Sequence, residues 1–329
     1  MRQAMPNPAT RNTGLFARIP VFVSILVLLA ALTGCESDDC LNCVDLPPPV
    51  VPTGVHSISG DNEVIVQWYD ISYAPYDGQY NENVTSYAIY SRFFQPGDEN
   101  DPNREFYFIG EVKWDENYDY TTGLHWFVDD EAENGEEYEY AVAAVNAAGV
   151  ESALSYELVT DAPLPMSPWG SNGYIPVTMH NAAGANRSLS GFIFSRAAAN
   201  QGDLNAGRVD PDIYTEDLLF TFTGGIPYVS ADLGQVLVQD FGVFSDANGL
   251  YFEGVSWAPY DGYSATGRLE LVPGHIYVVQ LGTGASPHYA KFGVTGRGTD
   301  TVDIIWAYQT IAGLPELSIP SDDPADEAR

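Results

Sequence analysis

The sequence predicts an all-β protein in which a β sandwich is followed by a second domain rich in antiparallel strands. Three observations predict this class. Short runs such as residues 64–68 and 138–144 repeat large apolar side chains at every second position, Val-x-Val-x-Trp in the first and Tyr-x-Tyr-x-Val in the second, which is the period of a strand. Clusters of Gly, Pro, Asn and Asp separate these runs. Long stretches with the 3.6-residue period of an amphipathic helix are missing.

The N-terminus has the layout of a secretory signal. Residues 1–18 hold three arginines and no acid, and residues 19–32 form an apolar run that is short for a membrane span. The run ends in Leu-Thr-Gly-Cys at Cys35, which resembles the bacterial lipobox, whose cysteine is diacylated and becomes the mature N-terminus. An ordinary signal peptide with a chance cysteine is the alternative. We therefore expect a lipid-anchored protein of the bacterial cell envelope, at the outer membrane.

Residues 35–52 are expected to form a lipidated tether. Acids directly after Cys35 resemble signals that send some lipoproteins to the outer cell surface, and the prolines that follow favour an extended conformation. Cys40 and Cys43 form one Cys-x-x-Cys pair, which supplies only two metal ligands, and no second pair completes a zinc site. The pair is either a small local disulfide or two free thiols, so we predict no metal site.

The charge of the chain excludes several classes of partner. Forty-five acids stand against thirteen basic residues, a formal net charge of −32, and removal of residues 1–34 with their three arginines leaves −35. Such a field repels nucleic acids and anionic lipid headgroups. Acidic clusters such as residues 98–101 and 129–131 lack the ligand spacing of a calcium loop. A solvated acidic face is therefore favoured over a weak divalent-ion site.

Residues 53–162 carry the pattern of a particular sandwich. Residues 135–149 read Gly-Glu-Glu-Tyr-Glu-Tyr-Ala-Val-Ala-Ala-Val-Asn-Ala-Ala-Gly, and a proline-rich entry, Trp68 and the Tyr-Ala-Ile-Tyr run at 87–90 accompany them. These features resemble a fibronectin type III domain, an immunoglobulin-like sandwich. The resemblance implies that Tyr138 forms a tyrosine corner, its hydroxyl bonded back to the backbone. Two segments depart from the family pattern as long insertions: residues 74–83 and 95–123.

A second antiparallel β-rich domain is expected at residues 169–318. A proline-rich linker at 163–168 precedes it, and residues 319–329 are expected to be a disordered acidic tail. The segment 182–203, rich in Ala, Gly and Asn, is expected to be loop with one short turn of helix. Seven strands are predicted in this domain: residues 174–179, 218–222, 235–239, 267–271, 276–281, 290–294 and 302–308.

The hairpin region 273–309 carries a second set of motifs. It contains Gly-His-Ile-Tyr-Val-Val at 274–279 and His-Tyr-Ala-Lys-Phe-Gly-Val at 288–294, followed by the strand 302–308. These motifs resemble the HmuY family of exported heme-binding lipoproteins, in which a Gly-x-x-Tyr strand precedes a Tyr-Ala-Lys strand. Family members that bind heme hold it between two His or Met axial ligands. We expect no resident cofactor in this chain, and the resemblance implies heme as the alternative.

Four side chains of the second domain are of the right type for such a ligand pair. They are Met179, His180, His275 and His288. None lies at a ligand position that the family pattern identifies, so ordinary histidines at strand ends are the alternative interpretation for each.

Aromatic residues give a second candidate site. Trp257, Tyr260 and Tyr263 lie in a turn rich in Pro and Gly, where exposed rings would suit a sugar or peptide partner. Trp306 and Tyr308, on a predicted strand, are expected to build the core instead. The turn sequence Ala-Pro-Tyr-Asp-Gly also occurs in the first domain, which we attribute to turn chemistry, with a shared binding loop as the alternative.

The sequence lacks the motifs of hydrolases, metalloproteases, phosphate-binding loops and dinucleotide-binding domains. We therefore predict no catalytic residues and a non-catalytic binding or adhesion protein, anchored in the membrane by its lipid, with the first sandwich as a spacer. The ligand is left open between a protein, a glycan and heme. Heme capture by the second domain is one alternative function, and an enzyme acting on an extracellular polymer is another.

Overall fold

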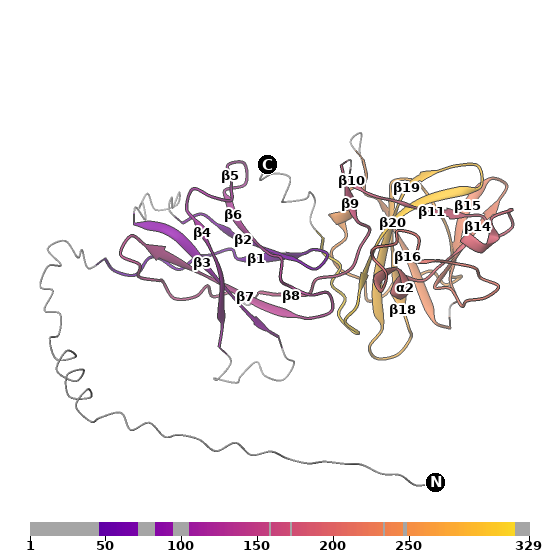
Figure 1. Ribbon diagram of the computed structural model, residues 1–329. Helices are drawn as coiled ribbons and strands as arrows, with labels where there is room; N and C mark the ends of the chain where they lie inside the picture. The colour runs from indigo at the N-terminus through magenta and orange to yellow at the C-terminus, as the bar shows by residue number, and fades with distance from the viewer. Residues whose placement is uncertain are drawn as a thin grey trace, which may run out of the picture. The chain divides into compact units, whose positions relative to one another are not determined.

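The computed structural model describes residues 46–71, 83–94, 105–157, 159–171, 173–232, 234–245 and 249–319. Regular structure in these ranges is almost entirely antiparallel strand, which confirms the predicted all-β class (Figure 1). Cys35, Cys40 and Cys43 lie outside the described residues, as do the signal segment and the acidic tail after Ile319. No helix in the described ranges has the length and apolar character needed to cross a membrane.

The first sandwich consists of two four-stranded sheets. One has the order β1-β2-β6-β5, built from β1 (His56–Ser59), β2 (Val64–Tyr69), β6 (Leu124–Asp129) and β5 (Tyr118–Asp119). The other has the order β4-β3-β7-β8, built from β4 (Tyr107–Lys113), β3 (Val84–Phe93), β7 (Tyr138–Asn146) and β8 (Val159–Asp161). Trp68, Tyr87 and Val142 are fully buried in one cluster. The alternation in the sequence thus corresponds to one hydrophobic core.

The expected insertion at residues 95–123 contains part of the sandwich. Its described portion holds β4, which pairs with β3, and β5, which pairs with β6. Strand β4 lies at a sheet edge, and of its seven residues only Val112 is buried. Because most of its side chains are exposed, the strand lacks the apolar alternation by which sequence analysis finds strands.

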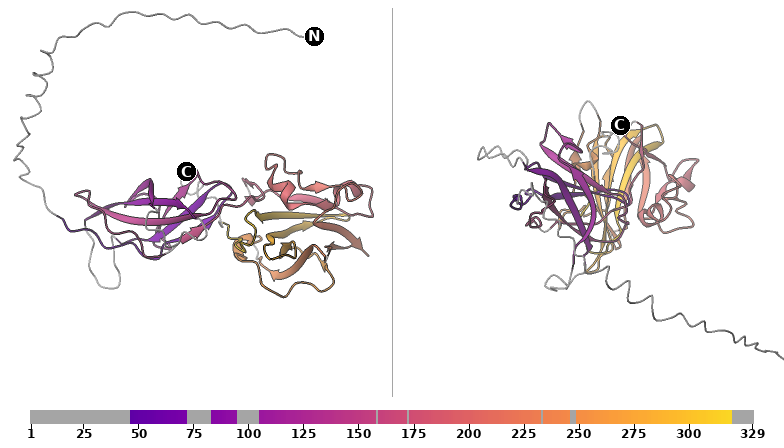
Figure 2. Two further views of the ribbon diagram at one scale, coloured as in Figure 1. Left: turned by 90° about the horizontal axis from the view of Figure 1, so that it is seen from below. Right: turned by 60° about the vertical axis from the view of Figure 1, so that its left-hand side comes forward.

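The second sandwich has two five-stranded sheets of its own (Figure 2). The first has the order β11-β20-β19-β18-β16: β11 (Val177–His180), β20 (Thr301–Gln309), β19 (His288–Arg297), β18 (His275–Leu281) and β16 (Val236–Val243). The second has the order β13-β12-β14-β15-β17: β13 (Arg208–Val209), β12 (Gly191–Phe192), β14 (Leu218–Thr223), β15 (Ile226–Ser230) and β17 (Arg268–Glu270). As predicted, Trp306 and Tyr308 belong to the core of this domain.

Most predicted strands of this domain are present, and four further strands were not expected: β9 (Trp169–Gly170), β12, β13 and β15. Strands β12 and β13 contain two residues each, too few for a recognisable pattern. Strand β15 contains Pro227, which lowers strand propensity. The predicted run 174–179 is divided between β11 and β10 (Gly173–Tyr174), and β10 pairs with the short strand β9. The short helix α2 (Phe194–Ala198) falls in the segment expected to hold one helical turn.

A third hydrophobic cluster covers the other face of the β11-β20-β19-β18-β16 sheet. Ile276 and Val278 of β18 belong to it, whereas Tyr277 and Val279 belong to the core between the sheets, as strand alternation requires. The covering side chains include Phe252 and Val255 on one loop and Leu317 on the last described segment. These irregular segments hold the candidate site.

The expected linker at 163–168 is buried rather than solvated. Leu164 and Ser167 have no exposed surface, and Met166 is 5% exposed. Met166 forms a bridge with Ala307 of β20, and the Ser167 N–H donates to Trp306 O at 2.7 Å. The prolines favour an extended linker. The side chains of Leu164 and Met166, at alternate positions of this linker, pack into the third cluster and so join the linker to the second domain.

Both domains contain a tyrosine whose hydroxyl fixes the preceding loop. The Tyr138 hydroxyl accepts from the Glu133 N–H at 3.0 Å, which confirms the expected tyrosine corner. In the second domain the Tyr277 hydroxyl accepts from the Val272 N–H at 2.9 Å and donates to Glu270 O at 2.8 Å. In each case the bonded N–H lies five residues before the tyrosine.

Candidate functional site

The loop at residues 255–264, here called the aromatic loop, displays two large rings to solvent. Trp257 is 55% exposed and Tyr260 is fully exposed. Tyr263, expected to be exposed with them, is half-buried, and its hydroxyl donates to Pro259 O at 3.0 Å. Burial raises the pKa of the Tyr263 phenol. The turn therefore presents two of the three aromatic residues and uses the third to brace itself.

The last described segment holds one side of the aromatic loop. Trp257 forms a bridge with Glu316, the Ala258 N–H donates to Pro315 O at 2.8 Å, and the Leu317 N–H donates to Ser256 O at 2.7 Å. Leu317 is fully buried. Backbone pairing on one side and apolar burial beneath it fix the path of the chain at Trp257.

The other side of the aromatic loop is fixed to strand β16. The Ser264 N–H donates to Val238 O at 2.8 Å. Gly262 has a φ of +91°, and a side chain there would place its Cβ 3.0 Å from Nε2 of Gln239. The left-handed backbone favours glycine here, and the end of the Gln239 side chain would have to shift to admit a Cβ. The exposed tip with Tyr260 and Asp261 is thus short and anchored at both ends.

Two ionisable residues near the aromatic loop were not identified by sequence analysis. Lys291 of β19 is fully buried and donates to the backbone O of Phe252 and of Val255. The sequence signal for a buried Lys291 was its place among apolar neighbours in a core strand. Burial raises the pKa of the Glu316 carboxyl to about 7, and the carboxylates of Asp161 and Glu137 add to this shift.

The four side chains considered as heme ligands have separate surroundings. Met179 is fully buried in the core between the sheets. Each histidine has a polar neighbour of its own: His180 Nδ1 lies 3.3 Å from Nδ2 of Asn186, His275 Nδ1 3.0 Å from both carboxylate oxygens of Asp240, and His288 Nδ1 3.2 Å from the backbone O of Gln309.

Strand register also separates these residues. Ile276 pairs with Gly293 and Leu281 with His288, so His275 and His288 lie at opposite ends of the β18–β19 hairpin. At 3.3 Å per residue this separation is about 20 Å along the strands. His180 follows the buried Met179 on β11, so the two point to opposite faces of the sheet. The structure does not bring the four residues together.

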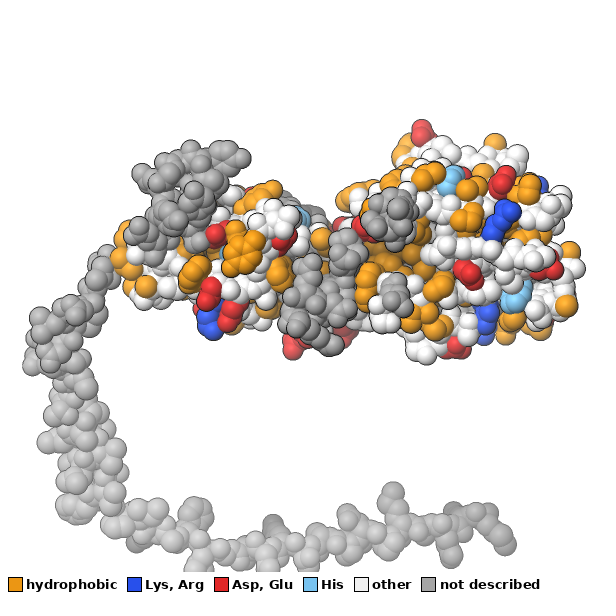
Figure 3. Space-filling model, turned by 90° about the horizontal axis from the view of Figure 1, so that it is seen from above, with side chains coloured by type: hydrophobic (Ala, Val, Ile, Leu, Met, Phe, Trp, Pro, Cys, Tyr) orange, Lys and Arg blue, Asp and Glu red, His pale blue; other side chains and the backbone are white. Residues whose placement is uncertain are grey.

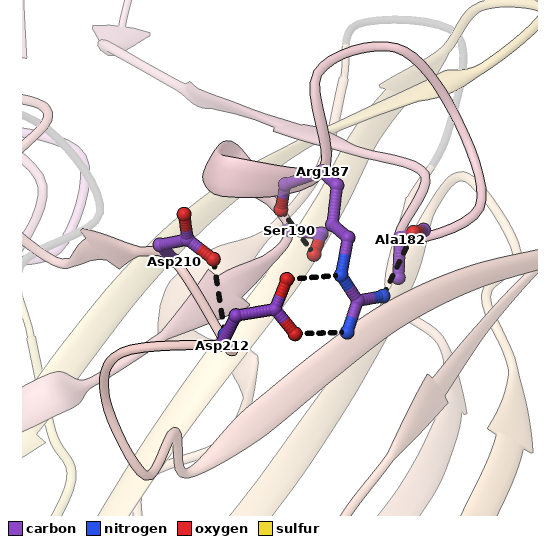
Figure 4. A network of polar contacts seen from close by, with 5 residues as sticks. All are labelled: Ala182, Arg187, Ser190, Asp210 and Asp212. Carbon is purple, nitrogen blue, oxygen red and sulfur yellow. Dashed lines mark hydrogen bonds and ion pairs between the residues drawn. The ribbon is translucent and has the colours of Figure 1, made fainter.

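The loop after His180 is held by an ion pair (Figure 4). Arg187 donates from two guanidinium nitrogens to the two carboxylate oxygens of Asp212, at 2.9 and 2.8 Å, and from a third to Ala182 O at 2.9 Å. The Asp212 N–H in turn donates to the Asp210 carboxylate at 3.0 Å. Because the Arg187 guanidinium is already paired with the Asp212 carboxylate, we assign this network a structural role rather than one in ligand binding.

The surface of the described residues carries few basic side chains. The face in Figure 3 shows hydrophobic side chains among polar ones, with few basic side chains. Within the described ranges, no three His, Cys, Asp or Glu side chains are grouped as a metal site would require. Of the side chains proposed from sequence for ligand contact, only Trp257 and Tyr260 lie together in one exposed loop.

Comparisons with known proteins give structural neighbours only. No family model matches the chain, and no curated protein matches it. A DUF4466 family protein from Parabacteroides merdae is 8% identical, with 81% of this chain and 96% of that chain covered and a TM-score of 0.37. The chicken CNTN1 FN1–FN3 domains are 15% identical, covering 79% of this chain and 65% of theirs, with a TM-score of 0.29.

A human FNIII domain is also 15% identical, covering 42% of this chain and 98% of the domain, with a TM-score of 0.25. The neighbours thus include fibronectin type III domains. At these identities and TM-scores the likenesses carry no conclusion about activity or ligand.

Proposed function

We propose that this chain is a non-catalytic binding protein of the bacterial cell envelope, which contacts an uncharged glycan through its aromatic loop. The observation that carries the proposal is the pair Trp257 and Tyr260, exposed on a loop that is anchored on both sides. Exposed apolar rings lose contact with water when a ligand covers them. A loop that is already ordered loses little conformational entropy on binding.

Charge favours an uncharged ligand. Residues 249–264 contain no Lys or Arg, and the chain as a whole carries a net charge of −32. An anionic polymer would therefore meet repulsion without a local counter-charge. The apolar face of a sugar ring matches the flat face of an indole or phenol ring, and the exposed Asp261 carboxylate can accept hydrogen bonds from sugar hydroxyls.

The remainder of the chain would present this loop away from the membrane. The lipobox-like motif at Cys35 and the proline-rich tether support a lipid anchor, with two or three acyl chains giving stable attachment. The first sandwich, with its own core, then acts as a spacer between the tether and the binding domain.

The test is the double substitution Trp257→Ala with Tyr260→Ala, measured by affinity electrophoresis of the full chain in gels containing neutral polysaccharides. We expect retardation of the wild-type chain and a loss of affinity of tenfold or more in the variant, about 1.4 kcal/mol or more. Tyr120→Ala is the matched control, because Tyr120 is also exposed, at 89%, but lies in the first domain.

Equal retardation of the double variant and the control would contradict the proposal. Binding of the wild-type chain to peptide probes alone would contradict the glycan assignment while leaving the loop as the contact.

A further inference from the structure

One of only two lysines in the chain lies in the hydrophobic interior. Lys113 is exposed, whereas Lys291 has no exposed surface. Neighbouring side chains on the same face of the sheet, such as Ile276, Val278 and Ile305, are apolar. Transfer of an amine from water into such surroundings is unfavourable unless its hydrogen bonds are replaced. Lys291 therefore places an amine where an apolar side chain would pack more favourably.

The Lys291 amine closes the turn that leads into the aromatic loop. Its Nζ donates to Phe252 O at 2.9 Å and to Val255 O at 2.8 Å, and it lies 4.7 Å from the centroid of the Phe252 ring. The two carbonyl groups are three residues apart: Phe252 begins the short helix η2 (Phe252–Gly254), and Val255 follows its end. Carbonyls at the end of such a turn need partners from outside it. One side chain thus fixes both ends.

The charges around Lys291 are consistent with this arrangement. Burial lowers the pKa of the amine well below its usual value, and the Glu253 carboxylate acts weakly in the opposite direction. A neutral amine retains two N–H groups, which matches the two carbonyl acceptors. Both hydrogen bonds are therefore available whether or not the amine is protonated.

We propose that Lys291 is a positioning residue for the aromatic loop: by holding the carbonyls of Phe252 and Val255 it sets the path of the chain at Trp257. Trp257 follows the second of these carbonyls by two residues, so rotation of that peptide group displaces the indole. The inference rests on the proposed function only in that the loop being positioned is the binding surface.

The test compares hydrogen–deuterium exchange at residues 250–258 in the full chain and its variants. Lys291→Met keeps the length of the side chain but removes both donors, and Lys291→Gln restores N–H donors on a shorter side chain. We expect exchange in this segment to accelerate about tenfold or more in Lys291→Met and less in Lys291→Gln, without comparable change in β18 and β20.

Val279→Ala is the control, because it removes buried hydrocarbon from β18 on the opposite face of the same sheet. Equal acceleration in Lys291→Met and Val279→Ala would overturn the proposal, as would uniform acceleration across the second domain. If Lys291→Met fails to fold, Lys291→Gln is compared with Val279→Ala instead. Exchange at residues 250–258 that is faster in Lys291→Gln than in Val279→Ala supports the proposal, and equal exchange overturns it.

A second readout separates this inference from the proposed function. Where the wild-type chain binds a neutral polysaccharide, we expect Lys291→Met to weaken that affinity about tenfold while Val279→Ala leaves it unchanged. If the wild-type chain binds none, the proposed function fails, and the exchange comparison still decides whether Lys291 positions the loop.

Discussion

At the scale of single residues, two ionisable groups lie next to the aromatic loop. Lys291 lies beneath it, and Glu316 pairs with Trp257 beside it. The Glu316 carboxyl is half-buried and lies near the charges of Asp161 and Glu137, and both effects disfavour its ionised form. Lysine and glutamate in a sequence are ordinarily read as surface residues, so neither position was predicted to matter.

We expect Glu316→Gln to remove a pH-dependent loss of stability. The folded chain keeps the Glu316 proton up to about pH 7, whereas the unfolded chain releases it near the ordinary pKa of 4.5. Since the folded state binds more protons between these values, the free energy of unfolding falls as the pH rises from about 4.5 to 7. Above pH 7 this contribution is constant.

Urea denaturation at pH 4 and pH 8 measures this effect. The variant should be close to the wild type at pH 4 and more stable by about 1–3 kcal/mol at pH 8. Glu111→Gln, at an exposed position, is the control and should show no such difference. The same stability change at both pH values for Glu316→Gln would show that the carboxyl is not perturbed.

At the scale of elements, the strands with a buried face were predictable and the edge and two-residue strands were not. Strand β7 repeats large apolar side chains with a period of two, and eight of its nine residues are buried. Strand β4 is mostly exposed, so its pairing with β3 could not be read from hydrophobicity. The tyrosine corners were predictable in part. The Gly-x-x-Tyr motif is visible in both domains, but the hydrogen bonds of the hydroxyl depend on how the preceding loop folds back.

We expect Tyr277→Phe to destabilise the chain by about 1–3 kcal/mol, because it leaves the Val272 N–H and the Glu270 carbonyl without their partner. Tyr138→Phe removes the bond from the Glu133 N–H and should cost about 1 kcal/mol. Chemical denaturation measures both. Tyr156→Phe, at a residue that is 82% exposed, is the control. A Tyr277→Phe chain as stable as the control would mean that the corner contributes nothing.

At the scale of the whole molecule, sheet topology determines which distant residues meet. The order β11-β20-β19-β18-β16 places His180 on one edge strand and His275 on the fourth strand. The β18–β19 hairpin sets His288 at the end opposite His275. Residue types alone permitted a ligand pair among them, but strand register and alternation keep them apart.

A hemin titration of the full chain tests this separation. We expect no saturable Soret shift, since strand order, register and alternation place Met179, His180, His275 and His288 apart in this fold. The triple variant with His180, His275 and His288 each changed to Ala serves as the baseline. A one-to-one spectral change in the wild-type chain that this variant lacks would show that the domain rearranges to form a heme site.

The all-β class, the core strands of a sandwich and of a second antiparallel domain, the tyrosine at the first corner and the exposure of Trp257 and Tyr260 could be predicted from the sequence alone. These features follow from local patterns: strand period, turn residues and short motifs act over a few neighbours. Three features became evident only in the folded chain: the proline-rich linker is buried, Tyr263 braces its own turn, and Lys291 lies under the aromatic loop. The burial of the linker and the place of Lys291 depend on which distant segment covers the outer face of a sheet, and no local pattern encodes that partner. The Tyr263 hydrogen bond depends on how its turn folds back on Pro259.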